Sequence, residues 1–164
     1  MRLITNAILI TLFIFINMNK LQAQKTQTKL DQTELLKQFI GTWVCDYKKD
    51  TSLIIENTPF GIGMISNGKI VTNGETIETI MQLYGYDKEK DRFNIAELIK
   101  SSSVLEIMNA RFISETSGEM IVTNTENAKY NWRFEFKTPD LIVQQALLDD
   151  EVVKEVLLNR EKSE

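Results

Sequence analysis

Alternating apolar and polar residues, interrupted by a turn signal at roughly 10–14-residue intervals, most constrain what this chain can fold into. The clearest case is Tyr130–Phe136, in which every second residue is aromatic. Asn73-Gly74 is a strong hairpin signal, because both residues tolerate a positive φ. No long helical pattern separates the alternating stretches, so the sequence predicts an all-β protein whose neighbouring strands are antiparallel.

About 8–10 strands joined by sequential hairpins form an up-and-down meander. A meander of this length protects its edges best by closing on itself, so we expect a single antiparallel barrel over residues 31–164. A two-sheet sandwich is the alternative, because hairpin spacing does not separate it from a flattened barrel. We expect a loop or broken strand at 57–63, which contains Pro59 and two glycines, and a turn at Gly68.

A short helix is expected before the first strand. Asp31 is a typical N-cap residue, and Glu34 stands three residues later, where its side chain can reach back to the cap. Apolar residues at helical spacing follow, namely Leu35, Leu36 and Phe39. Gly41 ends the segment. A helix over 31–40 has about two turns, so it must be held by packing against the strands.

The first 23 residues have the pattern of an export signal. Arg2 precedes an apolar run over 7–16, and a polar stretch then leads to Ala23. This order is typical of a secretory signal peptide, cleaved here after Ala23. The run is shorter than the roughly 20 residues that span a bilayer, and an uncleaved membrane anchor is the alternative. We expect residues 24–30 to be a flexible N-terminus of a periplasmic or secreted protein without stable membrane insertion.

Charge and composition narrow the possible partners and chemistry. Removal of Arg2 and Lys20 with the signal takes the formal net charge from −4 to −6, which argues against nucleic acid as a partner. Cys45 is the single cysteine and alternates with large aromatic residues, which favours a small buried side chain over a catalytic thiol. The chain has no histidine, which excludes imidazole-based triads, histidine-ligated haem and the common histidine-containing zinc sites. We expect no metal and no cofactor.

The start of the first expected strand resembles a known family. A short helix followed by Gly41-Thr42-Trp43 is similar to the Gly-x-Trp signature of lipocalin-like (calycin) barrels. In that superfamily the helix closes one end of the barrel, and the tryptophan packs there against an arginine from the last elements. The resemblance implies that Gly41, Trp43 and Arg160 close this barrel. A guanidinium can stack on an indole while it donates to backbone carbonyls.

A closer resemblance is to an uncharacterised bacterial family of such barrels, which combines a Gly-Thr-Trp strand, a central Gly-Tyr-Asp hairpin and a terminal arginine. Gly85-Tyr86-Asp87 stands at the matching position, and the resemblance covers about residues 35–161. The stretch 94–100 departs from the family, since it lacks the Trp and Asp that members often carry there. The resemblance therefore implies the fold and no shared ligand chemistry. Nitrobindin-type haem barrels open similarly but use a histidine that this chain lacks.

A barrel of this size encloses space for its own side chains or for one modest ligand. The residues expected to line such a cavity, or alternatively to fill the core, are Tyr47, Met64, Met81, Phe93, Ile107, Met120, Phe134 and Val143. The polar residues on candidate inward faces are Glu97, Asn109, Arg111, Arg133 and Gln145. A buried Glu97–Arg111 pair would anchor a polar ligand group, whereas an ion pair on the outer surface is the alternative.

These patterns favour a carrier of a small hydrophobic or amphipathic ligand, either a monomer or a homodimer. The alternative is a protein–protein interaction or inhibitor module of the cell envelope with a filled barrel, whose acidic hairpin at 149–151 meets a basic partner. Enzymatic acid–base chemistry would need paired carboxylates. The spacing of Glu78, Glu97 and Glu135 singles out no pair, so we expect no catalytic residue.

Overall fold

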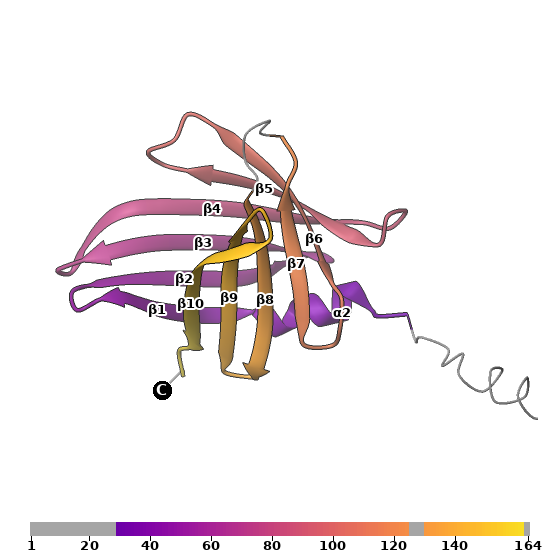
Figure 1. Ribbon diagram of the computed structural model, residues 1–164, viewed down its shortest axis with the longest axis horizontal. Coiled ribbons are helices and arrows are strands. Elements are labelled where there is room, and N and C mark those ends of the chain that lie inside the picture. Colours follow the sequence, from indigo (N-terminus) through magenta and orange to yellow (C-terminus); the bar gives the residue numbers. More distant parts are fainter. Residues whose placement is uncertain (1–28, 125–129, 163–164) are drawn as a thin grey trace, which may run out of the picture.

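Ten antiparallel strands close into one barrel in the computed structural model, which describes residues 29–124 and 130–162 (Figure 1). Each strand pairs with its neighbour in the sequence, and β1 pairs with β10 to complete the ring. The predicted up-and-down barrel is confirmed, and the sandwich alternative is wrong. The expected signal peptide 1–23, residues 24–28 of the expected flexible N-terminus and the expected turn at 126–129 lie outside the described residues.

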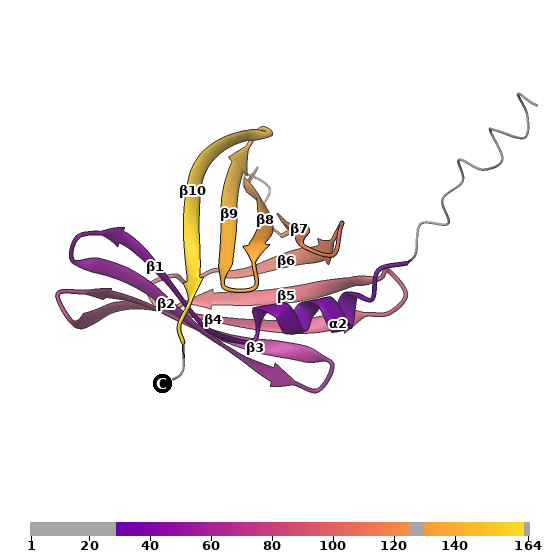
Figure 2. The same ribbon diagram turned by 90° about the horizontal axis from the view of Figure 1, so that it is seen from below.

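Two short helical segments precede the barrel, α2 (Gln32–Leu36) and the 3-10 helix η1 (Lys37–Phe39). The strands then follow as β1 (Gly41–Lys48), β2 (Thr51–Phe60), β3 (Gly63–Thr72), β4 (Glu75–Asp87), β5 (Arg92–Ile99), β6 (Leu105–Phe112), β7 (Ser117–Val122), β8 (Tyr130–Thr138), β9 (Leu141–Leu148) and β10 (Glu151–Arg160). In Figure 2, β8–β10 run steeply across the direction of β1–β5. No helix in the described part of the chain is long and apolar enough to cross a bilayer.

Two hairpins turn through consecutive residues with positive φ. Asn73 and Gly74 have φ values of 52° and 82° between β3 and β4, as the sequence predicted. Asp149 and Asp150 have φ values of 49° and 68° between β9 and β10. Asn and Asp adopt this conformation more readily than other residues with side chains, so both turns follow from local sequence.

The interruption expected at 57–63 is wrong, because β2 continues through Pro59 to Phe60. Pro59 pairs with Met64 of β3 on one side. On the other side, the pairing with β1 already ends where Gly41 lies opposite Asn57. Pro59 therefore stands where β2 has a free edge, and its missing N–H breaks no hydrogen bond between strands.

The turn expected at Gly68 is also wrong, because β3 is continuous from Gly63 to Thr72. Gly68 lies opposite Ile80 of β4, and a Cβ built on it would lie 3.3 Å from the Ile80 Cβ. The glycine thus gives the large Ile80 side chain room on the same face of the sheet.

The helix begins as predicted at Asp31, whose carboxylate accepts from the backbone N–H groups of Thr33 and Glu34 at 3.1 and 3.0 Å. Glu34 itself does not reach back to the cap but pairs with Lys37. Helix α2 is then fastened to the barrel by the buried Gln32. Its amide donates to the Phe112 carbonyl at 3.0 Å and accepts from the Phe112 N–H at 2.7 Å. The short helix is thus held by the strands.

Trp43 and Arg160 meet at the end of the barrel that η1 covers, hereafter the closed end. Trp43 is 1% exposed, and its indole N–H donates to the Phe39 carbonyl at 2.7 Å. The Arg160 guanidinium lies 4.2 Å from the centre of the Trp43 ring. This is the contact expected from the resemblance to lipocalin-like barrels, and it joins the first strand to the last.

The same guanidinium donates to carbonyls of separate segments. Arg160 Nη1 donates to Ile40 O, Nη2 to Gln38 O at 2.7 Å and Nε to Pro139 O at 3.1 Å. Gly41 has a φ of +115°, and a Cβ at this position would lie 2.9 Å from Arg160 Nη1. Glycine is therefore required here both by the backbone and by the close approach of the arginine.

A cluster of aromatic rings fills the closed end above this contact. The Phe39 ring centre lies 5.0 Å from that of Phe134 and 4.9 Å from that of Phe136, both in edge-to-face geometry. Trp43 packs edge-to-face on Phe136 at 6.0 Å. These rings come from η1, β1 and β8, so the cluster couples the helical cap to strands on both sides of the β9–β10 hairpin.

Replacing Trp43 with alanine should lower the free energy of unfolding by about 3–5 kcal/mol, because it leaves a cavity and removes the partner of Arg160. Urea denaturation measures the loss. Leu157→Ala is the control, since this leucine lies on the same seam but is half exposed, and it should cost far less. An unchanged stability for Trp43→Ala would contradict its role in closing the barrel.

Candidate functional site

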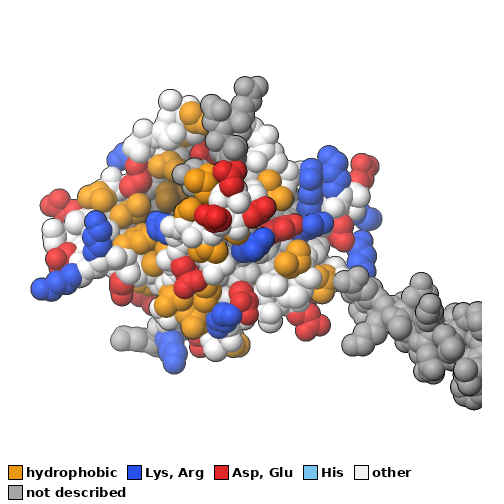
Figure 3. All heavy atoms as spheres, viewed as in Figure 1, with side chains coloured by type: hydrophobic (Ala, Val, Ile, Leu, Met, Phe, Trp, Pro, Cys, Tyr) orange, Lys and Arg blue, Asp and Glu red, His pale blue; other side chains and the backbone are white. Residues whose placement is uncertain are grey.

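A cavity of about 720 Å³ lies inside the barrel. Residues of all ten strands line it, while Leu36 and Phe39 from the helical segments cover its closed end. Its size falls within the range of roughly 300–1,000 Å³ that is typical of small-molecule sites. Figure 3 shows hydrophobic side chains gathered around a hollow on one face of the molecule. The barrel is therefore not filled by its own side chains.

Most of the apolar residues predicted for the wall do line the cavity: Tyr47, Met64, Phe93, Met120 and Phe134. Met81, Ile107 and Val143 do not, which corrects the prediction at these positions. Met81 is 50% exposed on the outer surface. The sequence was ambiguous there because β4 and β6 carry apolar residues at both odd and even positions, and a shift of one residue exchanges the two faces.

The polar residues predicted for the inner face divide in the same way. Glu97 lines the cavity, while Asn109, Arg133 and Gln145 do not. Arg111 borders the cavity, but its side chain is 60% exposed and its Nε bonds Glu119 at 2.8 Å. The proposed Glu97–Arg111 pair is therefore wrong, and Arg111 instead forms a cross-strand ion pair at the surface.

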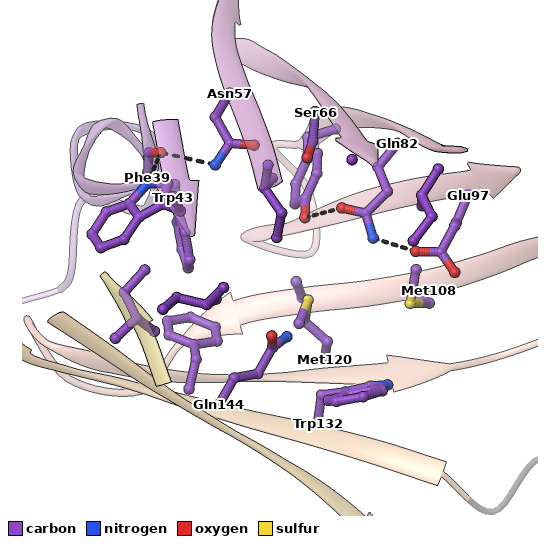
Figure 4. Close-up of a pocket in the computed structure, with 18 of the residues that line it drawn as sticks. Phe39, Trp43, Asn57, Ser66, Gln82, Glu97, Met108, Met120, Trp132 and Gln144 are labelled. Carbon is purple, nitrogen blue, oxygen red and sulfur yellow. Dashed lines mark hydrogen bonds between the residues drawn. The ribbon is translucent and has the colours of Figure 1, made fainter. Parts of the chain in front are cut away.

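A chain of three polar side chains crosses the cavity wall on β4 and β5 (Figure 4). The Tyr84 hydroxyl donates to Gln82 Oε1 at 2.8 Å, and Gln82 Nε2 donates to a carboxylate oxygen of Glu97. Gln82 and Glu97 are direct partners in the β4–β5 pairing. Sequence reasoning missed Tyr84 and Gln82, although their shared even parity with the apolar Ile80 on β4 was a usable signal.

Burial raises the pKa of the two end residues of this hydrogen-bonded series, Tyr84 and Glu97. Burial raises the pKa of the Tyr84 hydroxyl well above its usual range, with a smaller contribution from the nearby Glu97. Burial also raises the pKa of the Glu97 carboxyl, while the hydrogen bond from Gln82 opposes this shift and the charge of Glu106 adds to it. The cavity thus disfavours negative charge at both positions.

Two further buried polar residues line the cavity on β2 and β3, and sequence reasoning missed both. Asn57 is 5% exposed, and its amide N–H donates to the Phe39 carbonyl at 2.9 Å. This bond fixes the amide so that Oδ1, which has no partner, is the unused acceptor. Ser66 is equally buried beside it in the sheet. Asn57 was hidden from the sequence because its segment was expected to be a loop.

The seam between β1 and β10 is short. Only two residue pairs join these strands in the sheet, Trp43 with Arg160 and Val44 with Asn159. Farther along, Lys154 Nζ lies 4.5 Å from the centre of the Tyr47 ring, which places the predicted site residue Tyr47 at this seam. Lys154 therefore contacts β1 through its side chain, in a cation–π contact, where the ladder of backbone hydrogen bonds has ended.

The buried Cys45 sits between these contacts and behaves as a core residue. It is free, and burial raises the pKa of its thiol, which disfavours the reactive thiolate. Among residues 29–124 and 130–162, no three His, Cys, Asp or Glu side chains gather as a metal site would require.

No known family model matches this chain, and no curated protein matches it either.

Glu97→Gln should change how stability depends on pH. Because burial raises the pKa of Glu97 in the folded protein above its ordinary 4.5, the folded state binds this proton more tightly than the unfolded chain does. The free energy of unfolding should therefore fall as the pH rises from below 4.5 through the raised pKa. The variant should lack this part of the fall.

Urea denaturation at pH values from about 4 to about 8 measures this dependence. Glu89→Gln is the matched control, because Glu89 is exposed in the β4–β5 turn, and it should keep the wild-type profile. Parallel profiles for wild type and Glu97→Gln would show that burial of this carboxyl has no effect on stability.

Proposed function

We propose that this protein is an exported carrier that holds one small apolar or amphipathic molecule inside its barrel. The observation that carries this proposal is the internal cavity of about 720 Å³, with a mostly apolar wall and a few polar side chains aimed into it. Sites of this composition bind small molecules through apolar contact and use the polar groups to fix orientation. The signal-like pattern of residues 1–23 supports export to the periplasm or the medium.

The position of the carboxylates favours binding over catalysis. Glu78 accepts from the backbone N–H groups of Thr79 and Ser101, and Glu135 pairs with Lys137, which is half exposed. Of the three carboxylates considered for acid–base chemistry, Glu97 lines the cavity. There it accepts from the neutral amide of Gln82, an arrangement that suits recognition of a ligand group.

The resemblance to lipocalin-like barrels adds to the same proposal. The Gly41-Thr42-Trp43 opening and Arg160 occupy the closed end, as they do in that superfamily. A tightly packed closed end leaves the remaining part of the barrel to hold a ligand, which is the division that a carrier needs.

A larger side chain at Ala146 should block the cavity. Ala146 is buried in the wall on β9, and Ala146→Phe should weaken binding of the neutral dye Nile red about tenfold or more, read by fluorescence titration. Ala96→Phe is the control, because Ala96 lies on β5 outside the cavity lining, and it should leave binding unchanged. Circular dichroism verifies that both variants fold.

Native mass spectrometry of the protein purified from its own envelope, followed by organic extraction, tests for a natural ligand. An added mass that is lost on extraction is the expected result. A clean ligand-free mass, together with no Nile red binding by the wild-type protein, would overturn the carrier proposal.

A second candidate, an interaction module, is favoured by a stripe of apolar side chains on the outer surface. Met81 pairs with Leu98, and Leu98 pairs with Leu105, across β4, β5 and β6. All three are about half exposed, so the stripe is available to a second copy of the chain. Sedimentation velocity should then show a dimer that Leu98→Lys dissociates. A monomer at all concentrations would count against this candidate.

A further inference from the structure

Two carboxylates face each other on the cavity wall. Glu97 of β5 and Glu106 of β6 are direct partners in the sheet, and both line the cavity. Like charges at directly opposed positions destabilise a sheet, and partial burial strengthens the repulsion. The negative charge of Glu106 accordingly raises the pKa of Glu97. In the barrel as described, this wall carries a concentration of negative charge.

No cation in the described part of the chain neutralises this pair. Arg111 is engaged by Glu119 at the surface. Lys154 belongs to β10, where its ammonium group lies over the Tyr47 ring of β1. β10 is five strands from β5 in either direction around the ring. The one polar contact that Glu97 makes is the neutral N–H donor of Gln82. The two partly exposed carboxylates therefore have no positively charged partner in the described part of the chain.

The other polar groups of the cavity also present acceptors. The Tyr84 hydroxyl donates its proton to Gln82, and Gln82 donates an N–H to Glu97, so this series of hydrogen bonds ends on an acceptor, the Glu97 carboxylate. On a different part of the wall, the Oδ1 of Asn57 is buried and has no partner. Figure 4 shows both groups on the wall of the same pocket. A molecule that supplies hydrogen-bond donors could pair with the carboxylate of Glu97.

We propose that the barrel takes a cationic amphiphile, whose amine head pairs with Glu97 and Glu106 while its apolar body lies along the remaining wall. This inference rests on the proposed carrier function and names the class of ligand. An ammonium group offers three donors and a positive charge, which matches a carboxylate pair. The apolar body would contact Met108, Met120 and Phe134.

The same geometry disfavours an anionic lipid such as a fatty acid. A ligand carboxylate at this wall would add a third negative charge to two that already repel each other, in a site partly shielded from water. At the opposite wall, Lys154 is exposed and stacked on Tyr47, so it would be only a weak ion-pair partner for the ligand carboxylate. Charge therefore decides between two ligands with the same tail.

Three probes with one tail separate charge from hydrophobicity: dodecylammonium, dodecanol and dodecanoate. Competition with Nile red, at probe concentrations below micelle formation, should show dodecylammonium binding about tenfold or more tightly than dodecanoate at neutral pH, with dodecanol between them. Glu97→Gln should remove most of this preference, because it should weaken dodecylammonium binding far more than dodecanol binding. Glu56→Gln, on the outer face of β2, should keep the preference.

The outcomes distinguish failure of the cationic preference from failure of the carrier function. If dodecanoate binds as tightly as dodecylammonium, or more tightly, the cationic preference is overturned while the carrier function stands. If none of the probes nor Nile red binds, both are overturned. Should Glu97→Gln fail to fold, Glu106→Gln takes its place with the same expected loss. A preference that survives in the folded variant would show that the carboxylate pair is not the site of the head group.

Discussion

The contact of Arg160 with Trp43 is the interaction on which the barrel depends. The sheet joins β1 to β10 through only two residue pairs, so backbone hydrogen bonding alone gives a weak closure of the ring. Arg160 adds a cation–π contact and donates to carbonyls at the helix end, at the entry to β1 and at the β8–β9 turn. A planar guanidinium with five donors can serve all these positions at once, which a lysine ammonium cannot.

This closure determines where a cavity can form. The aromatic rings of η1, β1 and β8 pack together at the closed end, and Phe39, Trp43 and Phe134 form part of the cavity lining there. Along the seam, Lys154 over Tyr47 bridges the strands by side chains after the ladder has ended. The side chains at the β1–β10 seam therefore serve to close the barrel. The wall formed by β4, β5 and β6, across the ring, carries the two carboxylates Glu97 and Glu106.

The sequence predicted those features that depend on local chemistry. The Asp31 cap, the Asn73-Gly74 turn and the alternation over Tyr130–Phe136 each depend on a few adjacent residues, and the barrel follows from the succession of short hairpins. The prediction from sequence failed where the local structure depends on neighbouring strands. Pro59 is tolerated because the adjacent strand has ended, and Gly68 is required by a side chain on β4.

The assignment of inner and outer faces failed for a related reason. Met81 and Ile107 belong to strands with apolar residues on both faces, and period alone cannot tell which face is inside. Met81, Leu98 and Leu105 form an apolar stripe on the outer surface, and such exposed apolar residues make the inner face ambiguous in the sequence. The anchoring of α2 by Gln32 was equally invisible, because its partner Phe112 is 80 residues away in the chain. Long-range partners of this kind are fixed by the closed ring.

The polar side of the cavity shows a conflict between stability and recognition. An apolar pair at Glu97 and Glu106 would extend the core without electrostatic cost, whereas two opposed carboxylates with one neutral donor reduce the stability of the folded state at neutral pH. Folding gives no reason to place such a pair inside a barrel. The barrel tolerates it because Arg160, Trp43 and the aromatic cluster stabilise the closed end, several residues away along the strands. If the barrel is a carrier as proposed, entry of a positively charged or donor-bearing group would relieve this cost, so the repulsion that weakens the empty barrel would favour such a ligand.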